Sequence, residues 1–284
     1  MQSIDLSENK LREIPKEIST LKNILIIDLH RNELLELPSE ISVLSQVPYL
    51  NLAQNELRSL PGTIGNMTDL RMLNLSENQL SVLPNEIENL KNLTELDVSK
   101  NKLIELNPKI GKLDNLEKLL LEKNALQKLP VEIGMLKNLT EIDVSSNILE
   151  YLPAEIGQMK SLETINLFNN KIVSIPVSIS QLSNLTTLNL YYNKLTTLPK
   201  EIGNLKKLEV LNLANNEIEK LPDEIGQLVA LEQLNLKNNI IKKVPRTFEQ
   251  LQTLQYINLS GNGMSEDEIN TVKALIPEES KQRF

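Results

Sequence analysis

The sequence lacks cysteine and tryptophan, and it contains a single histidine, His30. The absence of cysteine excludes disulfides, thiolate metal sites and thiol nucleophiles. A histidine-rich metal site or a Ser-His-Asp triad would depend on His30 alone, so we expect neither catalysis nor a cofactor. Aromatic residues make up only 3% of a chain that is 40% hydrophobic, so the core should be aliphatic.

The sequence also lacks an excess of basic residues and a long apolar run. Its net charge is −8, with lysine and arginine mixed among the acids. Binding to a phosphate backbone needs a basic surface, so nucleic acid is not an expected partner. No apolar run approaches the length of a membrane span. The first residues have no basic and apolar leader, so we expect no signal peptide within this chain.

The dominant feature is an asparagine that recurs every 23 residues, which indicates an internal repeat. Counted from this asparagine as position zero, aliphatic residues recur at −8, −5, −3, +2, +5, +9 and +12. Proline recurs at +6 in ten of eleven repeats; the exception is Asn107, which is followed by Pro108. The asparagines are Asn9, Asn32, Asn55, Asn78, Asn101, Asn124, Asn147, Asn170, Asn193, Asn216, Asn239 and Asn262.

Each part of this repeat has a physical interpretation. The alternation at −5 and −3 predicts a short strand with two residues facing inward. One such strand cannot bury its face alone, so successive repeats should stack into a parallel sheet. The asparagine should point inward, where its amide satisfies backbone groups of adjacent turns. The proline cannot extend the strand, and the aliphatic residues at +9 and +12 suit a short helical or 3₁₀ turn on the outer side.

The pattern LxxLxxLxLxxNxLxxLPxxIxx resembles the leucine-rich repeat in its 23-residue form, over nearly the whole chain. Within that superfamily it is most like the leptospiral family of spirochaete proteins. The resemblance implies an α/β horseshoe-shaped solenoid, with a concave parallel sheet and short helical or 3₁₀ turns on the convex side. It also implies a secreted or surface bacterial protein that binds host proteins without catalysis, in an adhesin-like role in virulence.

Two alternatives to this function remain open at the sequence level. Animal intracellular leucine-rich-repeat scaffolds share much of the consensus, so a cytoplasmic scaffold for protein–protein interaction is the first. An enzyme or metal protein is the second, and no constellation of residues in the sequence supports it.

The two ends of the chain differ. We expect residues 1–264 to form the repeats and residues 265–284 to form a helical cap of the same domain. Ser265 with Glu268 suggests a capping box, and Pro277 should end the helix. At the other end Met1 already occupies position −8, so the first repeat begins in mid-motif. Either a leader or cap has been removed upstream, or the uncapped edge strand at residues 4–6 pairs with another molecule, as in a dimer.

Positions −6, −4 and −2 alternate with the core positions and should line the concave surface, with −1 at its border. We call this surface the strand face. Its residues vary between repeats, whereas the core positions barely change. Five of the eight aromatic residues fall on these positions, and exposed aromatics on a rigid surface are common anchors of protein recognition. They are Tyr49, Phe168, Tyr191, Tyr192 and Tyr256.

Two regions of the strand face are predicted to bind a partner. The first is a group of carboxylates around Leu120, which we call the acidic belt. The positive charge of Lys118 partly offsets their negative charge. Beside it we expect the aromatic cluster Phe168, Tyr191 and Tyr192, with Tyr191 one strand, about 4.8 Å, from Phe168. Together they suit a protein with basic and apolar groups. The belt comprises Glu95, Asp97, Glu122, Glu141 and Asp143.

The strand face also has plain structural interpretations. Position −4 is nearly always Asp or Asn, and short polar side chains there could simply hydrogen-bond along the sheet. The aromatic residues could likewise be placed by chance on a tolerant surface.

Overall fold

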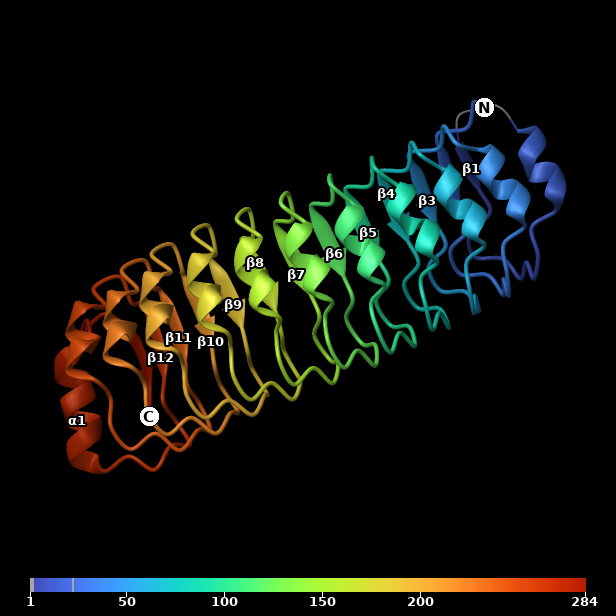
Figure 1. Ribbon diagram of the computed structural model, residues 1–284. Coiled ribbons are helices and arrows are strands. Elements are labelled where there is room, and N and C mark those ends of the chain that lie inside the picture. Colours follow the sequence, from blue (N-terminus) through green and yellow to red (C-terminus); the bar gives the residue numbers. More distant parts are fainter. Residues whose placement is uncertain (1–2, 22) are drawn as a thin grey trace. The chain divides into compact units, whose positions relative to one another are not determined.

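The computed structural model describes residues 3–21 and 23–284, so Met1 lies outside the described residues. Contacts between Cα atoms divide the chain into two units, residues 1–143 and residues 144–284. In each unit the strands line one side and short 3₁₀ helices line the other (Figure 1). This is the predicted leucine-rich-repeat architecture.

In the first unit strands and 3₁₀ helices alternate along the chain. The strands are β1 (Ser3–Asp5), β2 (Ile26–Asp28), β3 (Tyr49–Asn51), β4 (Met72–Asn74), β5 (Glu95–Asp97), β6 (Lys118–Leu120) and β7 (Glu141–Asp143). The helices are η1 (Lys16–Thr20), η2 (Ser39–Val43), η3 (Gly62–Asn66), η4 (Asn85–Asn89), η5 (Pro108–Lys112) and η6 (Val131–Met135).

The second unit continues the alternation and ends differently. Its strands are β8 (Thr164–Asn166), β9 (Thr187–Asn189), β10 (Val210–Asn212), β11 (Gln233–Asn235), β12 (Tyr256–Asn258) and β13 (Lys281–Arg283). Its 3₁₀ helices are η7 (Ala154–Gln158), η8 (Val177–Gln181), η9 (Lys200–Asn204), η10 (Asp223–Gln227) and η11 (Arg246–Gln250), followed by the α-helix α1 (Glu266–Leu275).

Neighbouring strands within each unit pair in parallel, and equivalent repeat positions lie opposite one another. Leu50 of β3 pairs with Leu73 of β4, and Leu188 of β9 pairs with Leu211 of β10. The inward leucines and isoleucines at −5 and −3 are almost wholly buried from the second repeat onward. The core is therefore aliphatic, as predicted, and Phe248 is an aromatic ring that occupies the +9 position usually held by isoleucine.

The repeated asparagine forms a hydrogen-bonded ladder inside each unit. In the repeat of Asn193, the amide nitrogen donates to the carbonyl oxygens of Leu167 and Leu190 at 2.9 and 3.1 Å. Its Oδ1 accepts the backbone N–H of Ile172 at 3.0 Å. The side chain is 8% exposed. One buried amide thus satisfies three backbone groups in two successive repeats, which explains why asparagine marks the register.

The recurring proline begins the 3₁₀ helix. Pro199 precedes η9 with φ −66° and ψ 144°, an extended conformation that turns the chain into the helix. In the repeat with the displaced proline, Asn107 takes this place and its side chain accepts the N–H of Lys109 at 2.9 Å. The helix η5 still begins seven residues after its asparagine, so the repeat length is preserved.

Position −1 has a backbone conformation that the sequence pattern did not reveal. From Glu8 to Asn238 this residue is left-handed in every repeat, with φ between 52° and 60°, and Gly261 completes the row with φ 77°. The conformation costs a residue other than glycine or asparagine roughly 1 kcal/mol. It turns the chain from the strand toward the buried asparagine.

The C-terminal cap contains the predicted helix and one strand that was not predicted. Ser265 caps α1 by accepting the N–H of Glu268, and the helix ends at Leu275, before Pro277. The Glu268 carboxylate accepts the N–H of Val244 at 3.0 Å, and so ties the helix to the last repeats. The new strand β13 pairs in parallel with β12 and extends the sheet of this unit.

Candidate functional site

The strand face is only partly open to solvent. Tyr49, Glu95 and Thr187 at position −6 are half-buried, whereas some small residues at −2 are buried, such as Ser99 and Ala214 at 8% and 1% exposure. Bulkier residues at −2 and −6 therefore provide most of the surface that a partner could touch.

The Asp or Asn at −4 has a structural role in each unit. Its Oδ1 accepts the backbone N–H of the residue two positions later, as Asp97 does from Ser99 at 2.9 Å and from the Ser99 hydroxyl at 2.5 Å. Asn189 also donates to Asn166 of the neighbouring strand at 3.0 Å. The plain structural interpretation of this row is therefore correct for these residues. Leu120 occupies the same position without an acceptor atom in its side chain.

The structure brings the aromatic cluster together in the second unit. The rings of Phe168 and Tyr191 are stacked, with centroids 5.1 Å apart and planes 6° apart. The ring of Tyr192 meets Tyr191 edge-on, with centroids 6.1 Å apart at 64°. Phe168 and Tyr191 are half-buried, and Tyr192 is 57% exposed. Such pairs contribute about 0.5–1.5 kcal/mol beyond their burial, so the three rings hold one another in place.

The backbone beneath the stacked rings is also fixed. The N–H of Phe168 donates to Asn166 at 3.2 Å, and the N–H of Tyr191 donates to Asn189 at 3.1 Å. The side chains of these two asparagines are hydrogen-bonded to each other. Tyr192 occupies the left-handed position with φ 60°, where its neighbours in sequence register, Asn169 and Asn215, suit the conformation better. A large aromatic side chain at this position is not required by the fold.

The other two predicted aromatic residues lie apart from the cluster. Tyr256 of β12 is half-buried, and its hydroxyl accepts from Asn258 at 3.1 Å. Tyr49 lies in the first unit, where burial, followed by the negative charges of Asp28 and Glu95, raises the pKa of its hydroxyl. These two tyrosines therefore belong to separate local environments.

The acidic belt of the first unit is partly neutralised. The ammonium of Lys118 lies 3.1 Å from Glu141, and that of Lys123 lies 3.0 Å from Glu122. Glu95 is the neighbour of Lys118 in the sheet register, yet Lys118 pairs with Glu141 on its other side. Leu120 is half-buried between these charges. The two ion pairs thus involve Glu141 and Glu122 and leave Glu95 outside them, a detail that the sequence alone did not give.

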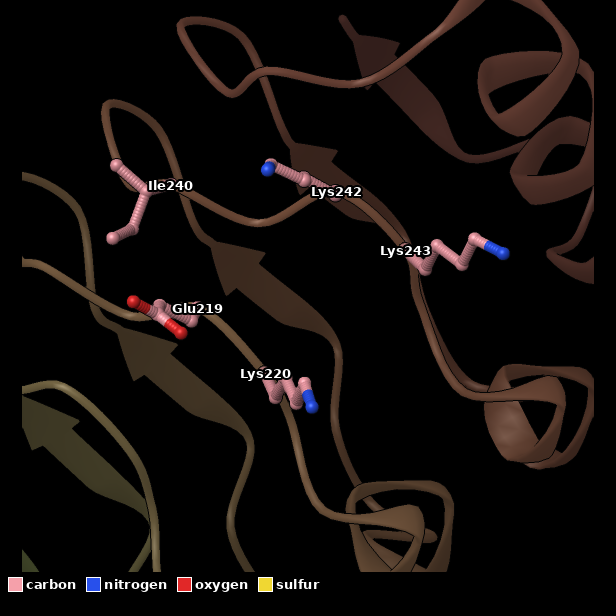
Figure 2. Close-up of a pocket in the computed structure, with 5 residues that line it drawn as sticks. All are labelled: Glu219, Lys220, Ile240, Lys242 and Lys243. Atoms are coloured by element: carbon pink, nitrogen blue, oxygen red, sulfur yellow. The ribbon is translucent and has the colours of Figure 1, made fainter.

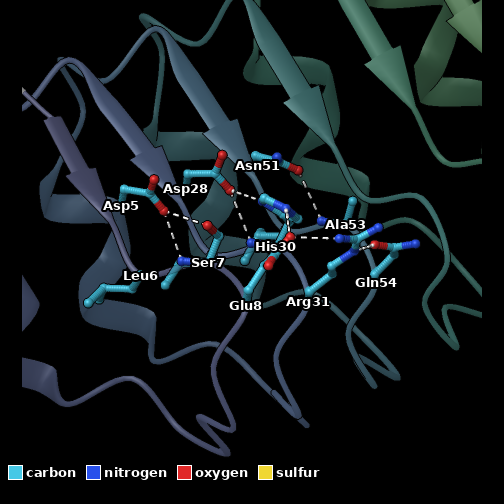
Figure 3. Close-up of polar contacts among 12 residues, drawn as sticks. Asp5, Leu6, Ser7, Glu8, Asp28, His30, Arg31, Asn51, Ala53 and Gln54 are labelled. Carbon is cyan, nitrogen blue, oxygen red and sulfur yellow. Dashed lines mark hydrogen bonds and ion pairs between the residues drawn. The ribbon is translucent and has the colours of Figure 1, made fainter.

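Polar side chains at the border of the first unit form a chain of contacts (Figure 3). Arg31 donates to Glu8 and to Gln54, both at 2.6 Å, and Gln54 donates to Glu77 at 3.1 Å. Lys100 then donates to Glu77 at 2.8 Å. All five residues occupy position −1. Hydrogen bonds from Lys100 and Gln54 lower the pKa of Glu77, so this carboxylate stays charged at neutral pH.

His30 lies at position −2 beside this chain. Its Nδ1 is 2.7 Å from Asp28, and its Nε2 is 4.0 Å from Glu8 (Figure 3). Among the described residues, no group of three or more His, Cys, Asp or Glu side chains could hold a metal ion. No helix in residues 3–21 and 23–284 is both long enough and apolar enough to cross a membrane.

A depression in the surface lies outside the strand face in the second unit. Its volume is about 580 Å³, and it is lined by Glu219, Lys220, Ile240, Lys242 and Lys243. Figure 2 shows the side chains of Lys242 and Lys243 pointing in opposite directions. Their charges do not converge on one point, so this depression has no arrangement that would define a ligand.

Comparison with protein families identifies the class to which this architecture belongs. The leucine-rich repeat region family matches residues 61–150 and 144–215, and the leucine rich repeat family matches residues 206–264. The first family alone covers more than half of the chain. The protein therefore belongs to the leucine-rich-repeat family, whose fold generally serves protein–protein interaction.

Several solved structures resemble the chain. The plant peptide hormone receptor RGFR1 in complex with RGF2 is 31% identical over 99% of this chain, with a TM-score of 0.83. The Arabidopsis thaliana receptor kinase ectodomain GASSHO1/SCHENGEN3, in complex with CASPARIAN STRIP INTEGRITY FACTOR 2, is 36% identical over 93%, with a TM-score of 0.80. This chain covers only 48% and 33% of those two chains.

A bacterial structure also matches the sequence. The Leptospira interrogans protein LIC12759 is 32% identical over 99% of this chain and 95% of its own, with a TM-score of 0.47. The chain thus resembles a leptospiral leucine-rich-repeat protein, as expected from its repeat. A comparison with curated proteins finds no match.

Proposed function

We propose that this protein is a non-catalytic binding module that recognises a protein partner through its strand face. The observation that carries the proposal is the aromatic cluster of Phe168, Tyr191 and Tyr192, whose rings are mutually packed and partly exposed. The stacked pair of rings is set on a hydrogen-bonded backbone, so little conformational freedom is lost when a partner covers it. Rigid aromatic anchors of this kind dominate the energetics of many interfaces.

The acidic belt contributes to the same proposal in a different way. Its uncompensated carboxylates would attract basic groups and raise the rate of encounter more than the final affinity. We therefore propose a partner that presents both apolar and basic side chains. Leu120, Tyr49 and Tyr256 are further contact residues in this proposal.

The cellular setting is a second part of the proposal. The likeness of the repeat to the leptospiral family favours a bacterial protein that is secreted or displayed on the surface and engages host proteins. The alternative is an intracellular scaffold. Protease treatment of intact cells distinguishes them, because a surface protein would be cleaved and a cytoplasmic one would stay intact. Intact protein after such treatment, with none in the medium, would remove the host-binding proposal.

The binding role itself is tested by capture from host extracellular material. A variant with Phe168→Ala, Tyr191→Ala and Tyr192→Ala should lose most of the captured protein, since each truncated anchor costs on the order of 1–2 kcal/mol. The control is Tyr151→Ala, because Tyr151 lies outside the strands and is 58% exposed, like Tyr192. Equal capture by wild type and a folded triple variant would remove the cluster from the proposal.

Dimerisation through the N-terminal edge is a separate prediction. Strand β1 pairs with β2 on one side, and its neighbour Leu6 is 37% exposed. A Ser3→Pro variant would remove a backbone donor from the free side of this edge strand, because the equivalent N–H of Met72 donates to the preceding repeat whereas that of Leu6 donates to β2. Light scattering of the wild type should show a dimer that the variant loses; a wild-type monomer would contradict the prediction.

A further inference from the structure

A small pocket opens on the strand face of the first unit. It is formed by neighbouring strands β3, β4 and β5, and its volume is about 180 Å³. Sites for cofactors and small-molecule ligands usually measure about 300–1,000 Å³, so this pocket has room for one side chain only. It is lined by Tyr49, Met72, Leu73, Asn74, Glu95 and Asp97.

Part of the pocket is apolar and exposed. Met72 at the centre is 39% exposed, and the half-buried Tyr49 lies beside it in the register. Ile26 follows Tyr49 in the same row and is 44% exposed. Exposed Ile26 and Met72, with half-buried Tyr49 between them, form an apolar stripe across three successive strands, against which a hydrocarbon chain can pack.

The opposite part of the pocket is negatively charged. In the described part of the chain the Glu95 carboxylate has no ion-pair or hydrogen-bond partner, since Lys118 pairs with Glu141. Both hydrogen bonds from Ser99 to Asp97 use Oδ1, which leaves Oδ2 outside these bonds. The raised pKa of Tyr49, due to burial and then to Asp28 and Glu95, is a second sign of negative potential here.

We infer that this pocket holds the side chain of a lysine or arginine from the partner protein, an inference that rests on the proposed binding function. The aliphatic stem would pack on Met72 and Tyr49, and the cationic head would meet Glu95 and Asp97. Long basic side chains combine these two characters. A cation over the face of a tyrosine ring gains a further attraction, and arginine makes such contacts more often than lysine.

The inference is tested with small probes on the whole chain. The protein carries ¹³C-labelled methionine methyl groups, and N-acetyl-argininamide, N-acetyl-lysinamide and the neutral isostere N-acetyl-citrullinamide are titrated in separate NMR experiments. The Met72 signal, assigned by its loss in Met72→Leu, should shift saturably with a cationic probe, with a Kd on the order of 1 mM. The citrulline probe should bind at least about tenfold more weakly.

The chain offers matched controls for this experiment. Met135 is 41% exposed but lies in η6, away from the strand face, so its signal should stay unshifted. Glu95→Gln should abolish the saturable shift of Met72. Glu132→Gln removes the same charge in η6, away from the pocket and without releasing Lys118 from Glu141, and should leave the shift in place. Equal shifts of Met72 and Met135, equal binding of the citrulline probe, or equal loss in both variants would overturn the inference.

The result is separable from the proposed function. The capture experiment tests the aromatic cluster of Phe168, Tyr191 and Tyr192 in the second unit. The NMR titration tests the pocket around Met72 in the first unit. A pocket that binds none of the cationic probes would overturn the basic-side-chain inference and leave the aromatic cluster untouched.

Discussion

The two units share one scaffold and differ in the side chains that cover it. At positions −6, −4 and −2 the first unit carries seven Asp or Glu residues, from Asp5 to Asp143, and the second carries none. The ion pairs described above all lie in the first unit. The second unit has an unbroken row of asparagines at −4, from Asn166 to Asn258, and the aromatic cluster beside it. One repeat thus supports two chemically distinct surfaces.

This contrast shows how repeat proteins separate stability from recognition. The buried leucines and the asparagine ladder recur in both units and specify the solenoid. The outward positions are free to vary because they lie on the far side of each strand. Changes to the scaffold should therefore have the same effect in either unit, whereas changes to the surface should not.

The largest effect is expected from breaking the asparagine ladder. Asn78→Ala in the first unit and Asn193→Ala in the second would each leave an N–H and two carbonyl groups without their partner. Each change should lower the free energy of unfolding by about 3 kcal/mol, because buried unpaired groups are costly. Urea denaturation measures the free energy of unfolding of both variants. A loss in one unit only would show that the scaffolds are not equivalent.

A somewhat smaller loss is expected from crowding the outer side. The Cβ atom of Gly111→Ala would collide with the carbonyl oxygen of Glu132, and that of Gly157→Ala with the carbonyl oxygen of Ser178. Both collisions are with backbone, which cannot move aside like a flexible side chain. Each variant should be destabilised by about 2 kcal/mol. Thermal unfolding measures this destabilisation. An alanine variant as stable as wild type would contradict the prediction.

The smallest effect concerns the charged border of the first unit. The pKa of Glu77 is lowered in the folded state, chiefly by the hydrogen bond from Lys100 and then by that from Gln54. Its stabilisation is therefore present above the unfolded pKa and is lost as the pH falls through the folded pKa. Because the Glu77 side chain is 39% exposed, the effect should be about 0.5 kcal/mol or less.

The variant Glu77→Gln isolates the pH-dependent contribution of this carboxylate to the free energy of unfolding. The variant should be slightly less stable than wild type at pH 7, and the difference should shrink as the pH falls through the lowered pKa of Glu77 and vanish once the wild-type carboxylate is protonated. Asn238 occupies position −1 in the second unit, bonds to Asn215 and carries no charge, so Asn238→Gln should show no such pH dependence. A constant difference between Glu77→Gln and wild type at every pH would contradict the assignment.

Most of the fold follows from the sequence because the asparagine register repeats without insertion. This register places Leu188 and Leu190 in the core and Phe168 next to Tyr191, and the structure has both features. The left-handed backbone at −1 was not predicted, since residues as different as Arg31 and Tyr192 occupy it. Strand β13 was missed because it follows no repeat; it forms by pairing with β12.

The candidate site could be predicted only in part. Periodicity tells which face a side chain occupies, but it does not tell which neighbour a flexible lysine will choose. Lys118 pairs with Glu141 and leaves Glu95 free of a cation in the described residues, and this choice depends on side-chain geometry. Which protein is bound does not follow from the fold, because one scaffold serves many ligands.

The most decisive measurement is the Kd for the captured partner, determined by calorimetry for the wild type, Tyr191→Ala and Tyr151→Ala. Tyr191→Ala removes the central ring of the aromatic cluster, and Tyr151→Ala removes an equally large ring outside the strands. We predict a Kd at least about tenfold higher than wild type for Tyr191→Ala and within about twofold for Tyr151→Ala. Equal affinities for the wild type and a folded Tyr191→Ala variant would contradict recognition through the aromatic cluster of the strand face.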